Sequence, residues 1–252
     1  NYCCIQGLTG KLGGISNIGI NPLFVDTSND YHLQINSPCI DAGNNSAVPP
    51  SLLTDLDGKL RIMNGIIDMG VYETLNTYNV DTINGDDNNN GLNRETAFAT
   101  IQRGINLANN SFTVLVWPGT YQEKINFLGK AITVKSADYP SILEAPNNFA
   151  VSFYHHEDAN SILKNFVIKK SCVGISITGS SPTISNVTVV NNKYGIKADG
   201  NSNPNIKNSI FWNNTIEDLV GCKARYSCIE RGGEDNINVN PQFADSNNED
   251  YH

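Results

Sequence analysis

The sequence predicts an all-β protein, most of which is a right-handed parallel β-helix, a solenoid of stacked coils. Two observations indicate this fold. Apolar positions and an Asn recur every 21 or 22 residues between 163 and 214, and apolar residues alternate with polar ones inside each interval. The composition agrees, because only 17% of residues are charged and the chain is rich in the Asn, Ser, Thr and Gly that favour tight turns.

The coil repeat is visible residue by residue. Five residues recur 22 positions later: Pro182, Ile184, Asn186, Asn191 and Asn192 become Pro204, Ile206, Asn208, Asn213 and Asn214. One coil earlier, Leu163, Asn165 and Ile168 precede Ile184, Asn186 and Val189 by 21 positions. An Asn at a sharp corner tolerates the left-handed backbone conformation, and stacked amides form hydrogen-bonded ladders. We therefore predict an Asn ladder through Asn165, Asn186 and Asn208.

One amphipathic helix is expected, from about Thr96 to Ala108, with Asn93 or Thr96 as its N-cap. Phe98, Ile101 and Ile105 share its apolar face. An uncovered end coil invites aggregation, so we expect these residues to cap the solenoid at its N-terminal end. The sequence thus divides into an irregular β-rich segment (1–75), an Asp/Asn-rich loop with the capping helix (76–111) and the coils with a further segment (112–252).

The two ends of the chain resemble each other. The matching residues near the N-terminus are Tyr2, Cys4, Ile5, Ile18, Asn21, Pro22, Phe24, Asp26, Asp30, Tyr31 and His32. They recur in order as Tyr226, Cys228, Ile229, Ile237, Asn240, Pro241, Phe243, Asp245, Asp250, Tyr251 and His252. A match of this length predicts a tandem array in which residues 1–75 close one unit and residues 76–252 begin the next.

The run YNVDTINGDDNNNGLNRETAFATIQRGINLA, followed by TVLVWPGTYQEKINFLGKAITVKS, resembles the cap and first coils of pectin-lyase-like right-handed β-helix proteins. The run from NPLFVD to DMGVYE resembles the closing segment of bacterial choice-of-anchor-Q-type surface proteins. These resemblances imply the order cap, β-helix and closing segment. They imply an architecture rather than an activity, because such folds occur in lyases, hydrolases, adhesins and purely structural modules.

Charge and cysteine content narrow the possible partners. The net charge is −8 and the longest basic run is Lys169–Lys170, which argues against nucleic acid as a partner. No apolar run is long enough to span a membrane. The six cysteines lack metal-type pairs, so either disulfides, with Cys222–Cys228 as a close pair, or buried free thiols are expected.

Two clusters are candidate sites. Asp86, Asn88 and Asn90 precede Gly91 as in the first half of a calcium loop, but Ala97 stands where the bidentate acid belongs. The loop is therefore either a structural calcium site completed by other acids or an Asx-rich turn. The run of His155, His156, Glu157 and Asp158 is a general base with its partner, a transition-metal site or a polar turn, and the polar turn is the preferred interpretation.

The leading hypothesis is a non-catalytic structural module of an extracellular or cell-surface repeat protein, such as a surface layer, sheath, fibre or adhesin component. Other copies of the unit would be its partners, and no cofactor would be required beyond possible structural Ca²⁺. The alternatives are a polysaccharide lyase or glycosidase, which would use the His155–Asp158 cluster, and an adhesin that binds extracellular glycans without turnover.

Overall fold

The computed structural model describes residues 1–5, 7–8, 14–62, 66–74, 76–245 and 251. They form two compact units, Asn1–Asn76 and Thr77–His252. The second unit is a parallel β-solenoid of about five turns with one short helix. Residues 77–111, with the predicted loop and helix, lie in this second unit, where the helix packs on the first strands of the solenoid.

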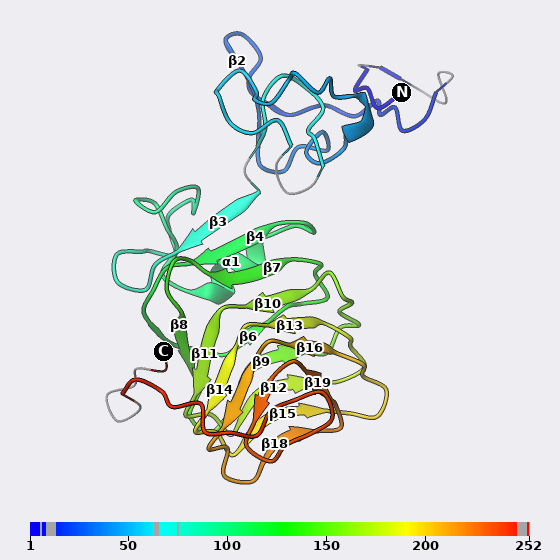
Figure 1. The fold of residues 1–252 in the computed structure, drawn as a ribbon. Helices are drawn as coiled ribbons and strands as arrows, with labels where there is room; N and C mark the ends of the chain where they lie inside the picture. The colour runs from blue at the N-terminus through cyan, green and yellow to red at the C-terminus, as the bar shows by residue number, and fades with distance from the viewer. Residues whose placement is uncertain (6, 9–13, 63–65, 75, 246–250, 252) are drawn as a thin grey trace. The chain divides into compact units, whose positions relative to one another are not determined.

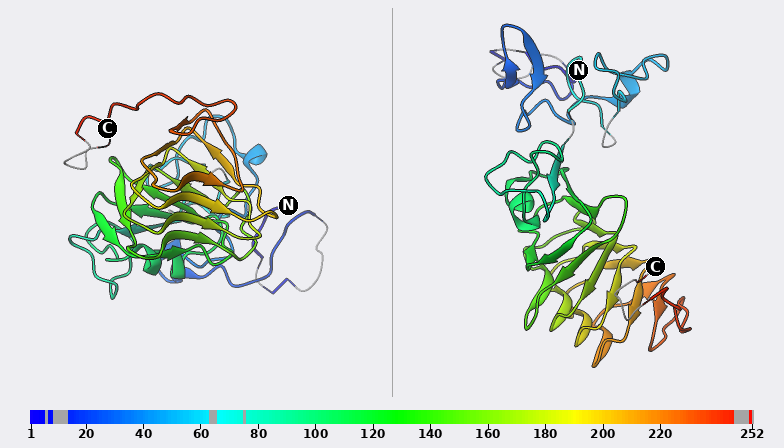
Figure 2. Two further views of the ribbon diagram at one scale, coloured as in Figure 1. Left: turned by 90° about the horizontal axis from the view of Figure 1, so that it is seen from below. Right: turned by 90° about the vertical axis from the view of Figure 1, so that its left-hand side faces the viewer.

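The solenoid has three parallel sheets, one for each side of the coil (Figures 1 and 2). The first consists of β3 (Thr77–Val80), β4 (Thr113–Val116), β7 (Thr133–Ser136), β10 (Ile162–Lys164), β13 (Thr183–Ser185), β16 (Asn205–Lys207) and β19 (Ala224–Arg225). The second consists of β5 (Thr120–Gln122), β8 (Ser141–Glu144), β11 (Phe166–Lys169), β14 (Thr188–Val190), β17 (Ile210–Trp212) and β20 (Cys228–Ile229). The third consists of β6 (Ile125–Asn126), β9 (Phe149–Phe153), β12 (Val173–Ile177), β15 (Tyr194–Ala198) and β18 (Glu217–Val220).

The predicted coil repeat is confirmed by the register of these strands. Leu163 pairs with Ile184, which pairs in turn with Ile206, so residues 21 and 22 apart stand directly above one another. All three side chains point into the core and are buried. Full burial of such a side chain contributes roughly 2 kcal/mol, and each coil repeats this gain on several sides.

The helix is shorter than predicted. α1 spans Ile101–Leu107 and its N-cap is Thr100, whose side chain accepts a hydrogen bond from the Arg103 N–H. Residues 92–96 form bends and a turn instead, and Phe98 forms a parallel bridge with Val80. Among the described residues, no helix is long and apolar enough to cross a membrane.

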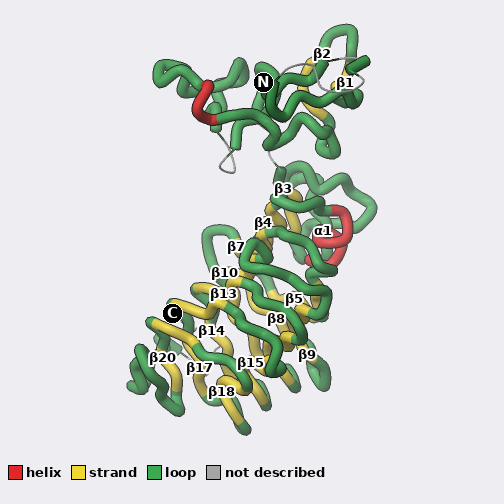
Figure 3. Tube along the Cα trace, turned by 90° about the vertical axis from the view of Figure 1, so that its right-hand side faces the viewer, coloured by secondary structure: helices red, strands yellow, loops and turns green. Residues whose placement is uncertain are grey.

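The apolar face assigned to the helix is buried as expected. Phe98, Ile101 and Ile105 have no exposed surface, although Phe98 precedes the helix. α1 packs on β3, β4 and β6 at the end of the solenoid where the coils begin (Figure 3). Gly104 permits this approach, because a Cβ there would lie 2.9 Å from Val114 Cγ1.

The first unit is irregular. It contains the antiparallel strands β1 (Phe24–Asp26) and β2 (Asp30–Leu33) and a 3₁₀ turn, η1 (Asn45–Ala47). Its core is small, with Leu33, Cys39 and Met69 buried at the centre. All six cysteines are free thiols, so the bridge expected between Cys222 and Cys228 is not formed. The Cys228 thiol instead donates to the Val239 carbonyl at 3.2 Å.

The predicted Asn corner and the polar ladder lie at different positions of the coil. Asn165, Asn186 and Asn208 have φ values of 65°, 54° and 51°, the left-handed conformation expected of a corner. However, the Asn186 and Asn208 side chains are exposed to solvent. The hydrogen bond between buried amides joins the third recurring Asn of the repeat, Asn192, to Asn214.

The ladder satisfies backbone groups inside the coil. Asn192 Oδ1 accepts from the Ser171 N–H at 2.9 Å, and its amide donates to Asn214 Oδ1 at 3.1 Å. The Asn192 amide also donates to the carbonyls of Ile168 and Val190, at 3.0 Å each. A buried amide with this many partners is stabilising only while all of them are present.

The two Asn positions predict different responses to substitution. Asn192→Ala should lower the free energy of unfolding by about 2 kcal/mol, because it leaves buried backbone groups without partners. Asn186→Ala should cost about 1 kcal/mol, since only the left-handed backbone disfavours Ala. Urea denaturation of the purified variants measures both values.

Substitution by glycine distinguishes the loss of hydrogen bonds at residue 192 from the backbone strain at residue 186. Asn186→Gly should recover nearly the wild-type stability, because glycine adopts a positive φ freely. Asn192→Gly should recover nothing. Equal losses at both positions, or a recovery at residue 192, would place the ladder at the exposed corner after all.

Candidate functional site

The His155–Asp158 run forms the turn between β9 and β10. Glu157 is buried at its centre, whereas His155, His156 and Asp158 are exposed. The Glu157 carboxylate accepts from the Gly129 N–H at 2.9 Å, the His155 N–H at 2.8 Å and the Ser180 hydroxyl at 2.8 Å. Gly129 and Ser180 belong to the loops of the preceding and following coils, so Glu157 fastens three coil loops together.

This geometry does not bring an acid and a base together on a substrate. The His155 Nδ1 is 3.9 Å from Glu157 Oε1, beyond hydrogen-bonding distance. The His156 ring nitrogen Nδ1 is 3.2 Å from the Gly179 carbonyl, and the Asp158 carboxylate accepts from the Asn160 N–H. His156 thus contacts the loop of the following coil and Asp158 its own turn, which supports the polar-turn interpretation.

The Asp/Asn-rich loop directs its oxygens to its own backbone. Asp86 Oδ1 accepts from the Asn88 N–H at 2.8 Å, and Asn90 Oδ1 accepts from the Leu92 N–H at 3.0 Å. These are Asx-turn bonds. Within the described ranges, no three His, Cys, Asp or Glu side chains group as metal ligands. Calcium binding by Asp86, Asn88 and Asn90 stays a prediction.

Two acids that sequence reasoning did not single out bind the start of α1: Asp87 of this loop and Glu123, which lies between β5 and β6. Asp87 accepts from the Ala99 and Thr100 N–H groups at 2.9 Å each. Glu123 accepts from the N–H groups of Ile101 at 2.8 Å and Gln102 at 3.0 Å. Burial raises the pKa of Glu123, while these two N–H groups oppose the rise. Both acids satisfy the free N–H groups at the start of the helix.

A buried ion pair lies on β8 and β11. Lys169 and Glu144 are register partners, and Lys169 Nζ is 3.5 Å from Glu144 Oε1. Lys170 Nζ approaches the same oxygen at 3.2 Å. Tyr251 covers the pair, with its ring 5.7 Å from Lys169 Nζ and its hydroxyl 3.1 Å from Asn191 Nδ2. Lys169 is thus not on the solvated face that strand alternation predicts, because the C-terminal segment crosses this sheet (Figure 1).

The first unit contains a charged cluster around His32. One ring nitrogen contacts Asp30, and the other is 2.9 Å from Asp57 Oδ2. The ring stacks on Tyr72 with centroids 3.8 Å apart. The hydrogen bond to Asp57, followed by that to Asp30, raises the pKa of His32. No sequence spacing indicates this cluster, since Asp57 is 25 residues from His32 and only the tertiary fold brings them together.

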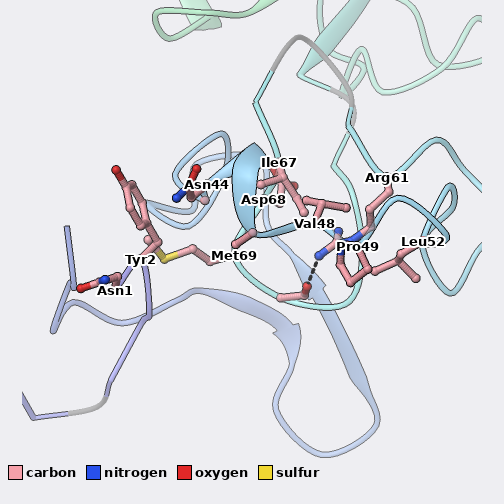
Figure 4. Close-up of a pocket in the computed structure, with 13 residues that line it drawn as sticks. Asn1, Tyr2, Asn44, Val48, Pro49, Leu52, Arg61, Ile67, Asp68 and Met69 are labelled. Atoms are coloured by element: carbon pink, nitrogen blue, oxygen red, sulfur yellow. Dashed lines mark hydrogen bonds between the residues drawn. The ribbon is translucent and has the colours of Figure 1, made fainter. Parts of the chain in front are cut away.

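A pocket of about 350 Å³ opens in the same unit (Figure 4). Its charged groups are Arg61 and Asp68. Arg61 pairs with the buried Glu73 and donates to the Gly70 carbonyl, the bond dashed in Figure 4. Asp68 accepts from the N–H groups of Asp41 at 2.8 Å and Thr74 at 2.7 Å. These charges hold the irregular loops of the unit in place.

The matching chain ends fold alike. We call residues 2–31 the first joint segment and residues 226–251 the second. The Ile5 N–H donates to the Ile18 carbonyl at 2.9 Å, as the Ile229 N–H does to the Ile237 carbonyl at 2.9 Å. Four further contacts of the first segment have a counterpart in the second. In the first segment they are Cys4 thiol to Ile20 O, Cys3 N–H to Asn17, Leu23 N–H to Asn21 and the edge-to-face pair Phe24–Tyr31. In the second they are, in the same order, Cys228 thiol to Val239 O, Ser227 N–H to Asn236, Gln242 N–H to Asn240 and the edge-to-face pair Phe243–Tyr251.

The second joint segment directly follows the last coil, because its strand β20 pairs with β17. The first joint segment therefore makes the same contacts as the second, and the second continues directly from a solenoid coil.

Comparisons with known proteins support the fold and nothing further. No family model matches the chain, and no curated protein matches it. A crystal structure of GH136 lacto-N-biosidase from Eubacterium ramulus, as a selenomethionine derivative, is similar at 13% identity and a TM-score of 0.42, over 59% of this chain and 34% of that chain. The native form of the same protein gives 10% identity and a TM-score of 0.37, over 61% of this chain and 41% of that chain. This is a distant similarity between parallel β-solenoids.

The three bonds to Glu157 predict a structural role that substitution can measure. Glu157→Gln should lower the free energy of unfolding by about 2 kcal/mol, because the amide NH₂ replaces an acceptor and faces a donor. The control is His155→Ala, whose side chain is 52% exposed and should change stability little. A stable Glu157→Gln protein would show that the carboxylate is free for another role.

Burial of Asp41 predicts a dependence on pH. Burial, reinforced by the nearby Asp68 carboxylate, raises the pKa of Asp41 from 3.8 to about 6. Between these values the folded state binds more protons than the unfolded state, so the contribution of Asp41 to stability falls as pH rises through this window. Asp41→Asn should therefore stabilise the protein at pH 7 by roughly 1 kcal/mol, and less at pH 4.

The difference in stability between wild type and Asp41→Asn reports on Asp41 alone. His32 also loses stabilisation as pH rises through its raised pKa, but it contributes equally to wild type and variant. Thermal unfolding at pH 4, 5, 6 and 7 supplies the comparison. A difference that stays constant across this range would contradict the assignment.

Proposed function

We propose that this chain is a non-catalytic structural module of a tandem-repeat protein that works outside the cell or at its surface. The observation that carries the proposal is the joint segment, which occurs twice with the same hydrogen bonds and, in its second copy, continues from a solenoid coil. A structure that returns to its starting motif after each solenoid suits an array of units rather than a single catalytic body.

The placement of the acidic residues supports the same function. Glu157 fastens coil loops, Glu123 and Asp87 hold the start of α1, and Glu73 pairs with Arg61. An acid–base mechanism on a glycan needs carboxylates that face a substrate. In the described part of the chain, these four acids are bonded to the protein itself.

In this proposal the solenoid is a right-handed rod of the pectin-lyase-like type, and the first unit is a closing segment of the choice-of-anchor-Q type. Stacked coils resist bending because each coil is bonded to the next along three sheets. The function is mechanical: each unit adds one rod to a filament, sheath, layer or adhesin stalk. Structural Ca²⁺ at the Asp86 loop and weak glycan contacts are compatible with this role.

The test is an array of known length. Proteins carrying one, two and three successive copies of residues 33–252 should have a maximum dimension, measured by small-angle X-ray scattering, that grows by an equal increment with each copy. A stiff chain of rods gives linear growth, whereas flexibly linked units give a much slower increase. Growth that falls well short of linear would contradict the proposal.

Enzymatic assays distinguish the alternatives. The chain should release neither unsaturated uronates nor reducing ends from anionic and neutral glycans. Turnover that is lost in His155→Ala or Asp158→Ala would establish the lyase or glycosidase instead. Specific retention on a glycan array, without turnover, would establish the adhesin.

A further inference from the structure

The two joint segments have the same fold but different neighbours. In the first, Tyr2, Cys4 and Ile18 pack against the buried cluster of Leu33, Cys39 and Met69. Their counterparts in the second segment are Tyr226, Cys228 and Ile237. Tyr226 is 72% exposed and Ile237 is 58% exposed, whereas Tyr2 and Ile18 are half-buried. Cys228 is buried in its own segment, at 8% exposed. Within the described residues, the second segment thus has two large apolar side chains, those of Tyr226 and Ile237, that are mostly uncovered.

On the opposite side of the two segments, it is the second segment that is buried and the first that is exposed. Ile229, in the second segment, is 3% exposed because β20 lies on β17 of the last coil. Its counterpart Ile5 is 37% exposed. Each segment is therefore covered where the other is open, so the chain contains the two halves of one complete joint.

The uncovered side is also hollowed. A pocket of about 560 Å³ is lined by Tyr226, Cys228 and Ile237 together with Ile210 of β17. In the first segment, the three corresponding residues contact the Leu33 cluster. The occupant of this pocket can be identified from that internal template, since the same side chains in the same backbone conformation present the same apolar shape.

We propose that Tyr226 and Ile237, with the pocket that Cys228 helps to line, form a docking surface for a closing segment with the sequence pattern of residues 33–69, supplied by a further repeat of the same protein. This proposal rests on the proposed function and names the contact that would join one unit to the next. The apolar cluster of the docked segment would cover Tyr226 and Ile237 as Leu33, Cys39 and Met69 cover Tyr2 and Ile18.

The occupant belongs to the same polypeptide rather than to a second molecule. In another molecule the cluster of Leu33, Cys39 and Met69 is already packed against its own Tyr2, Cys4 and Ile18. A docking segment from that molecule would have to give up these contacts to make equivalent ones, with no net gain. A segment attached in sequence has no such competitor, and its effective concentration is high.

The experiment extends the chain in register. His252 is the counterpart of His32, so a second copy of residues 33–76 is attached after His252. Hydroxyl-radical labelling with mass spectrometry then compares Tyr226 with Tyr2 in one sample. In the extended protein the labelling rate of Tyr226 should fall several-fold, to about that of Tyr2, while that of Tyr2 stays unchanged.

Two controls make the result decisive. An extension with aspartate in place of its Leu33 and Met69 has the same length but no apolar cluster, and should leave Tyr226 as reactive as in the original chain. The methionine of the added copy that corresponds to Met69 reports whether the added segment has folded, because Met69 itself is 9% exposed.

Unchanged labelling of Tyr226 in the extended protein would overturn the proposal, whether or not the added methionine is protected. Protection of Tyr226 in the original chain at rising protein concentration would also overturn it, since a second molecule would then be the occupant. The outcome is separable from the proposed function: scattering measures how stiff the array is, and labelling measures whether this surface is covered.

Discussion

The backbone N–H and C=O groups of each coil form their hydrogen bonds with the coil before it and the coil after it. Leu163, for example, pairs with Val134 on one side and with Ile184 on the other. This constraint sets the requirements for the rest of the unit. Inward positions must be apolar, polar atoms inside the coil must bond within the stack, and both end coils must be covered. The remaining features of the molecule are ways of meeting these three requirements.

The polar groups inside the stack are the clearest case. Asn192 and Asn214 replace missing backbone partners at the point where the chain turns from one sheet to the next. Glu157 does the same for three successive loops. A cluster that looks catalytic in the sequence is therefore consistent with coil-to-coil fastening, because a carboxylate is the acceptor best able to satisfy several donors at once.

The ends of the stack are treated differently. At the start, α1 and Phe98 cover the first coils, and the acids Asp87 and Glu123 fix the helix there. At the other end, β20 continues the second sheet and begins the second joint segment. The contrast between Ile229, which is covered, and Ile237, which is open, shows that this end presents a defined apolar surface rather than a bare coil edge.

Four features can be predicted from the sequence alone: the coil period, the inward residues Leu163, Ile184 and Ile206, the buried face of the cap and the repeat of the chain ends. These are local or periodic signals, so a single strand or coil is enough to reveal them. The sequence placed the start of the helix too early, because the bridge between Phe98 and Val80 is a contact between segments that a local pattern does not show. It also did not indicate which recurring Asn is buried, and the hydrogen bond between buried amides joins Asn192 to Asn214. The folded structure was needed to reveal that Lys169 is buried beneath Tyr251 and that His32 lies between Asp30 and Asp57. Alternation along a strand predicts which side a residue faces, but not which distant segment will cross that side.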